Sequence, residues 1–315
     1  MVKNQKVKMN ITVKLSNGVT MPHLGLGTYP MKGMELTNAV LNAYQSGYRL
    51  IDTADNYYNE GDLGESLNVL YDKTGARREE MFLVSKVSDE LYEPGTIGGG
   101  VNKGKYFWKS SPVMQQPNAV RQVVGMKIDQ TLQNLKTDYL DLYLMHWPYP
   151  DFFEEIWYEM ERVYQNGKVR AIGVCNCRER HFEKLGKSCN VFPMVNQFET
   201  SPINTKASLV DYCNSHDVRV MVYSPLMSLR RKEMTDYQAY ISVLSEKYCR
   251  NAAQINLRFD VQRGLIPIPK SSHGERLKAN MSVFDFSLTQ EEMDRLFSFN
   301  VDFQTLPESK ACPGL

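Results

Sequence analysis

Four residues near the ends of short apolar runs have side chains suited to moving protons. The runs 48–52, 82–86 and 142–146 end in Asp52, Lys86 and His146. Tyr57 follows the first run by five positions. Such runs are typical of strands buried on both faces, and α/β barrels carry their catalytic residues at the carboxyl ends of parallel strands. The set includes no strong nucleophile, which favours carbonyl reduction over hydrolysis.

Carbonyl reduction needs a hydride at carbon and a proton at oxygen. No side chain supplies hydride, so this chemistry requires a nicotinamide cofactor. Tyr57 is the candidate proton donor, and we expect the Lys86 ammonium to lower the phenol pKa from ~10. Asp52 can hold Lys86 in place, and His146 can donate a hydrogen bond that polarises the carbonyl. Each residue alone has an ordinary explanation as a cap, a packed ring or a surface charge, and only their joint placement favours catalysis.

An alternation of strands and helices surrounds these residues. Asn17-Gly18, between apolar residues at 13–15 and 19–21, predicts an N-terminal β-hairpin. Apolar residues at helical spacing predict helices within 120–135, 153–164 and 252–261, and Thr289 with Glu292 predicts a capping box. Eight strands are predicted: 24–27, the three runs above, and 169–174, 193–197, 218–223 and 265–269. This pattern predicts one closed (β/α)8 barrel (a TIM barrel) spanning residues 1–315 as a single domain.

Composition excludes several classes of function. The chain has 315 residues, with 37 Lys and Arg against 36 Asp and Glu, so it lacks the basic field of a nucleic-acid binder. No apolar stretch approaches the ~18 residues that span a membrane, and the first residues lack an apolar signal region. The six cysteines are scattered, which favours reduced thiols over a metal module. We therefore expect a cytoplasmic enzyme with no metal, no nucleic acid and no membrane partner.

One segment does not match a regular barrel. About thirty residues, 88–117, separate the third strand from the next helix, whereas such connections usually have ~2–6 residues. The segment leaves the barrel at the rim where the reactive residues are expected. A functional lid and a tolerated surface insertion explain it equally well.

At these residues the chain resembles the aldo-keto reductase family, over roughly residues 10 to 298. The resemblance rests on long motifs at 15–22 and 24–29, on Gly47-Tyr48-Arg49-Leu50-Ile51-Asp52-Thr53-Ala54 with Tyr57 and Asn59-Glu60, on Val84-Ser85-Lys86, and on 140–148 through His146. The resemblance implies that Asp52, Tyr57, Lys86 and His146 form the family's catalytic tetrad. It also implies NAD(P)H-dependent reduction of a small-molecule aldehyde or ketone, and a monomer or weak dimer.

The resemblance further implies where the cofactor lies. Asn176 and Gln197 match the residues that hold the nicotinamide carboxamide, and Tyr223 matches the ring that stacks on the nicotinamide. Charge and hydrogen bonds from Lys270, Ser271 and Arg276 to a 2′-phosphate favour NADPH over NADH. The implied cofactor-binding residues are Thr28, Tyr29, Asp52, Asn176, Gln197, Tyr223, Ser224, Leu226, Lys270, Ser271, Arg276 and Asn280.

The chain departs from the family pattern near the substrate and the adenine. Cys175 replaces a serine beside Asn176, and Ala279 replaces a glutamate beside Asn280. Residues 87–89 lack a usual aromatic, and the region after residue 300 has no family pattern, so the substrate does not carry over. Two alternatives remain open: a nucleotide-binding regulatory subunit with little turnover, and a biosynthetic carbonyl reductase dedicated to one substrate.

Overall fold

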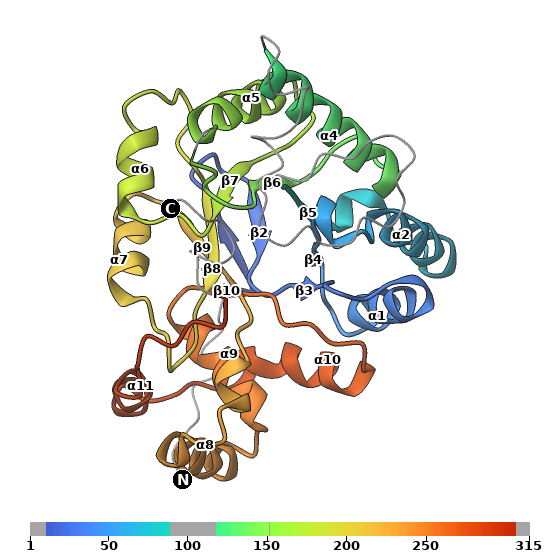
Figure 1. Ribbon diagram of the computed structural model, residues 1–315. Coiled ribbons are helices and arrows are strands. Elements are labelled where there is room, and N and C mark those ends of the chain that lie inside the picture. The colour runs from blue at the N-terminus through green and yellow to red at the C-terminus, as the bar shows by residue number, and fades with distance from the viewer. Residues whose placement is uncertain (1–10, 89–117, 151, 307–315) are drawn as a thin grey trace.

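The computed structural model describes residues 11–88, 118–150 and 152–306, and these contain a barrel of eight parallel strands ringed by helices (Figure 1). The strands pair in chain order from β3 to β10. Their bounds are β3 (Leu26–Gly27), β4 (Leu50–Asp52), β5 (Phe82–Val87), β6 (Leu142–Met145), β7 (Ile172–Cys175), β8 (Val195–Glu199), β9 (Arg219–Tyr223) and β10 (Ile266–Pro267). Each predicted strand is therefore confirmed, and most are shorter than their apolar runs.

Backbone hydrogen bonds between β3 and the region of β10 join the two ends of the strand order. The Gly25 amide donates to the Pro267 carbonyl at 3.0 Å, and the Gly27 amide donates to the Pro269 carbonyl at 3.3 Å. A Cβ at Gly27 would lie 2.7 Å from the Ile268 carbonyl oxygen, so only glycine permits this close approach. The predicted closed (β/α)8 barrel is confirmed.

The N-terminal hairpin covers the amino-terminal end of the barrel. It consists of β1 (Thr12–Lys14) and β2 (Thr20–Pro22), and its turn places Gly18 at a φ of 86°, which suits glycine. The Asn17 amide donates to the Arg170 carbonyl at 2.9 Å, and Arg219 donates to the Lys14 carbonyl at 2.8 Å. Arg170 precedes β7 and Arg219 begins β9, so the hairpin lies opposite the rim formed by the strand ends.

Helices surround the strands, and the predicted capping box is confirmed at the start of one of them. Gly167 adopts a φ of 75° just after α5, and the Thr289 hydroxyl accepts from the Glu292 amide at the start of α11. The helices are α1 (Gly33–Gln45), α2 (Glu60–Thr74), α4 (Ala119–Leu135), α5 (Phe153–Gln165), α6 (Glu179–Leu185), α7 (Ala207–Ser215), α8 (Thr235–Tyr248), α9 (Ala252–Gln262), α10 (Gly274–Met281) and α11 (Gln290–Phe297).

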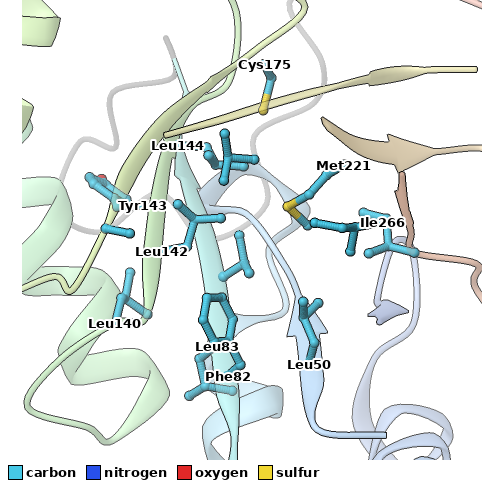
Figure 2. Close-up of a cluster of buried hydrophobic side chains, with 14 of the residues drawn as sticks. Leu50, Phe82, Leu83, Leu140, Leu142, Tyr143, Leu144, Cys175, Met221 and Ile266 are labelled. Carbon is cyan, nitrogen blue, oxygen red and sulfur yellow. The ribbon is translucent and has the colours of Figure 1, made fainter. Parts of the chain in front are cut away.

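The main hydrophobic core fills the barrel and the layer between strands and helices. Figure 2 shows Leu50, Met221 and Ile266, from three different strands, gathered in this cluster. A second cluster lies between α8, α9 and α11 and includes Tyr237, Phe259 and Leu296. The barrel is a packed core, so an active site has to lie at one of its ends.

The predicted insertion at 88–117 lies outside the described residues except for Ser88, which is fully buried. Within the described ranges, no helix combines the length and apolar character needed to cross a membrane. The same ranges contain no group of three or more His, Cys, Asp or Glu side chains placed to hold a metal ion.

Candidate active site

Three neighbouring strands and one short turn deliver the four predicted catalytic residues to the same rim. Asp52 ends β4, Lys86 is the next-to-last residue of β5, and His146 directly follows β6. Tyr57 ends the 3-10 turn η1 (Asp55–Tyr57), which leaves β4. Because β4, β5 and β6 are parallel and adjacent, their carboxyl ends meet at one edge.

Lys86 connects the carboxylate of this site to the phenol. Its Nζ donates to Asp52 Oδ1 at 2.6 Å, to the Thr53 carbonyl at 2.7 Å and to the Tyr57 hydroxyl at 3.3 Å. The Lys86 side chain is fully buried and Asp52 is nearly so. Burial disfavours the ammonium, but the neighbouring acidic groups, Asp52 foremost, together outweigh burial and raise the pKa of Lys86 above its ordinary value. Lys86 is therefore a fixed cation beside the Tyr57 oxygen.

Two further residues hold Asp52 from other strands. Gln197, in β8, donates from Nε2 to Asp52 Oδ2 at 2.8 Å, so each carboxylate oxygen has a donor. Thr28, which follows β3, donates to the Asp52 carbonyl from its backbone amide at 3.1 Å and from its hydroxyl at 2.9 Å. Gln197 thus fixes the carboxylate that holds Lys86, and Thr28 fixes the backbone of the same residue.

His146 lies beside Tyr57 in a neutral form. The two rings meet edge to face with centroids 5.8 Å apart, and the His146 amide donates to the Val87 carbonyl at 3.0 Å. Burial, with additional repulsion from Lys86 and Lys127, holds the pKa of His146 well below its ordinary value. A neutral imidazole retains one N–H, which can donate to an oxygen placed next to the Tyr57 hydroxyl.

The Tyr57 phenol differs from the expectation drawn from the sequence. The Lys86 ammonium does act to lower the pKa of Tyr57, but burial acts more strongly and raises that pKa to about 12. Tyr57 therefore keeps its proton at neutral pH in this structure. That is the state required of a proton donor, with Lys86 in place to stabilise the phenolate left behind.

A second group of predicted residues surrounds Asn176, just after β7. The Tyr223 hydroxyl donates to Asn176 Oδ1 at 3.0 Å, and the Asn176 amide donates to the Gln197 carbonyl at 2.9 Å. Asn176 and Ser224 adopt positive φ values of 58° and 53°, which turn the chain sharply at the ends of β7 and β9. Leu226 follows in the same loop and is partly buried.

The remaining predicted cofactor residues lie at two other places on the rim. Tyr29 is 61% exposed, with its ring centroid 5.0 Å from that of Tyr57. Lys270 and Arg276 are exposed, and Lys270 Nζ lies 3.1 Å from Glu35 Oε1. These two cations belong to a separate patch with the buried Ser271 and Asn280, formed by the segment from β10 into α10.

Sequence reasoning missed a group of buried charges directly behind the rim. Lys127 in α4 pairs with Asp55 in η1, and Glu60 at the start of α2 accepts from the Ser85 hydroxyl at 2.7 Å. The signal for Lys127 was its position in an apolar helical stripe, three residues after Val124. A lysine on a buried face requires a partner, and the partner lies 72 positions away.

Comparison with known proteins matches this architecture to one family. The model of the Aldo/keto reductase family matches residues 21–301. The chain is similar to glyoxal reductase of Bacillus subtilis, with 37% identity over 94% of this chain and 95% of the relative. It is also similar to 9,11-endoperoxide prostaglandin H2 reductase of Trypanosoma cruzi, with 36% identity over 92% of each chain. Among solved structures, a Bombyx mori aldo-keto reductase in complex with NADP superposes with a TM-score of 0.78, at 30% identity over 95% of each chain.

Proposed function

Because the chain belongs to the aldo/keto reductase family, we propose that it reduces an aldehyde or ketone to an alcohol with NADPH, with Tyr57 as the proton donor. Family membership makes the protein an NAD(P)H-dependent oxidoreductase that acts on carbonyl groups. Beyond this, we propose which residues transfer the proton, and we propose that NADPH is preferred over NADH.

The observation that carries the proposal is the contact of Lys86 with both Asp52 and Tyr57. Bound reduced nicotinamide supplies the hydride, which no side chain here can provide. His146 and Tyr57 together orient the carbonyl oxygen, and the Tyr57 hydroxyl gives it a proton as negative charge develops. The Lys86 ammonium, 3.3 Å from that hydroxyl, stabilises the resulting phenolate. In alcohol oxidation, the phenolate accepts the proton.

The groups on the rim suit a nicotinamide dinucleotide phosphate. The amides of Asn176 and Gln197 can pair with a carboxamide, and the partly exposed Tyr223 ring can stack against a flat heterocycle. The exposed cations Lys270 and Arg276 lie apart from the residues around Asn176, which suits the 2′-phosphate at the other end of NADPH. The Bombyx mori relative, which binds NADP, supports this assignment.

The relatives identify the substrate only as a small carbonyl compound. The two curated relatives differ by one percentage point in identity, yet one is named for glyoxal and the other for a prostaglandin endoperoxide. We therefore propose dicarbonyls such as glyoxal as the first compounds to try, since a further relative, 32% identical over 90% of this chain, is named for methylglyoxal.

The experiment follows the oxidation of NADPH and of NADH by absorbance with a panel of aldehydes, ketones and dicarbonyls. We expect turnover with at least one carbonyl class and a higher kcat/KM for NADPH than for NADH. Turnover of no carbonyl, with cofactor binding retained, would contradict the proposed reaction. Equal kcat/KM values for the two cofactors would contradict the role of Lys270 and Arg276.

A further inference from the structure

A second buried ion pair lies directly behind the catalytic rim. Lys127 Nζ is 2.6 Å from Asp55 Oδ2, and the two side chains are 7% and 6% exposed. Lys127 extends from the apolar face of α4, which packs beside β5 (Figure 1). A charged pair on a buried helix face requires desolvation of both ions, so stability alone gives little reason for its presence.

The Asp55 carboxylate links three elements of the site. Besides the ion pair with Lys127, both of its oxygens accept from the Ser88 amide at 3.2 Å. Lys127 Nζ also donates to the Ser88 hydroxyl at 3.3 Å. Asp55 is the first residue of η1, and Tyr57 is the last. The pair therefore attaches the turn that carries the phenol to α4 and to the end of β5.

The same contacts connect Lys127 to His146 through the end of β5. Ser88 follows Val87, whose carbonyl accepts from the His146 amide. Among the residues that the structure describes, the Tyr57 ring from η1 contacts His146, and the charges of Lys86 from β5 and Lys127 from α4 act on its imidazole. The positive charge of Lys127 thus acts on the His146 imidazole, and Asp55, its ion-pair partner, anchors the η1 turn that ends in Tyr57.

We propose that Lys127 is a positioning residue for carbonyl reduction, because it holds Asp55 and thereby the turn that presents Tyr57 to the substrate oxygen. This inference rests on the proposed function of the rim. It gives the site two buried Lys–Asp pairs with different tasks. Lys86–Asp52 contacts the phenol itself, and Lys127–Asp55 fixes the backbone that carries the phenol.

The first test compares Lys127→Met, which keeps most of the length of the side chain, with the double variant Asp55→Asn/Lys127→Met, which removes both charges of the pair. Misplacing the phenol should lower kcat by up to about 100-fold in both, with KM and the NADPH dissociation constant changed by less than about threefold. Arg78→Met is the matched control. It removes the cation of the Arg78–Asp141 pair at the opposite end of the barrel, where Arg170 still pairs with Asp141, and should leave kcat unchanged.

The second test does not depend on activity. The chain has five histidines, so the His146 ring signal can be assigned in NMR spectra with His146→Asn. Loss of the Lys127 charge should raise the pKa of His146, whereas Arg78→Met should leave it unchanged. Wild-type kcat and wild-type His146 titration in a folded variant lacking Lys127 would overturn the proposal, even if the melting temperature falls.

The two tests separate this inference from the proposed function. If wild-type protein reduces no carbonyl, the proposed function fails, and an unchanged His146 titration in the variants would then reject the link between Lys127 and the site independently. If Lys127→Met does not fold, the double variant decides by the same criteria, because it removes both charges together.

Discussion

Lys86 and Lys270 each pair with a carboxylate at the same end of the barrel, but in opposite environments. Lys86 lies 2.6 Å from Asp52 with the two side chains 0% and 2% exposed, whereas Lys270 lies 3.1 Å from Glu35 with 40% and 51% exposed. Water and salt screen the exposed pair, so it is weak and exchangeable. The buried Lys86 ammonium has no access to water or to other anions and therefore keeps Asp52 as its partner. A fixed cation suits a phenol that must release its proton at one place, and an exchangeable cation suits a phosphate that arrives and leaves.

The largest effects should follow from breaking the buried pair. Lys86→Met leaves the Asp52 carboxylate buried without its cation, which should cost roughly 3–5 kcal/mol of stability. It also removes the ammonium that we propose stabilises the Tyr57 phenolate, so turnover should fall by about 10²- to 10⁴-fold. Chemical denaturation and steady-state kinetics measure the two effects.

Two further variants sharpen that result. Asp52→Asn/Lys86→Met removes both charges and should recover much of the stability while turnover stays low. Lys270→Met, which breaks only the exposed pair, should unfold like wild type. Equal destabilisation by Lys86→Met and Lys270→Met would show that burial does not distinguish the two pairs.

Glu60 provides an intermediate case, a buried carboxyl hydrogen-bonded to neutral donors. Burial, followed by repulsion from Asp55, raises the pKa of Glu60 from 4.5 to about 7. The folded state therefore holds this proton more tightly than the unfolded state. Its contribution to stability is present below about pH 4.5 and is lost as pH rises through 7.

Glu60→Gln should remove that loss. The pKa of Glu60 rises from 4.5 to about 7 on folding, and this difference corresponds to roughly 3 kcal/mol of stability. Wild type should lose this stability between acid and neutral pH, and the variant should not. Urea unfolding across that range measures the change, and Glu79→Gln, at an exposed position, is the control. If the free energy of unfolding of Glu60→Gln changed with pH as steeply as that of wild type, this would contradict a proton bound at Glu60.

The smallest expected effect concerns the exposed pair. If Lys270 binds the 2′-phosphate, as we propose, then Glu35 competes with that phosphate for the Lys270 ammonium. Glu35→Gln should therefore tighten NADPH binding by about two- to fivefold and reduce its dependence on salt. NADH binding, which involves no 2′-phosphate, should not change. Fluorescence titration measures both, with Glu79→Gln as the control. Equal tightening for NADPH and NADH would contradict the assignment of Lys270 to the phosphate.

The sequence predicted the barrel and the main catalytic candidates because strand ends are local features. Asp52, Lys86 and His146 each end an apolar run, and parallel pairing then brings them to one edge without further information. Tyr57 was predicted for the same reason, since only five positions separate it from Asp52.

The long-range contacts and the balance of electrostatic effects could not be predicted in the same way. Gln197 reaches Asp52 across 145 positions, and Lys127 reaches Asp55 across 72, and no local pattern encodes either contact. The pKa of Tyr57 depends on burial as well as on its neighbouring cation. The sequence identified the cation, but only the packed structure shows that burial has the larger effect.

The most direct test of the central claim is Tyr57→Phe, which removes one hydroxyl and leaves the ring. NADPH should bind within about threefold of wild type, because the phenol is assigned to the substrate oxygen and not to the cofactor. The rate of carbonyl reduction in a single turnover should fall by about 10²- to 10⁴-fold. A single-turnover rate within tenfold of wild type would contradict the assignment of Tyr57 as the proton donor.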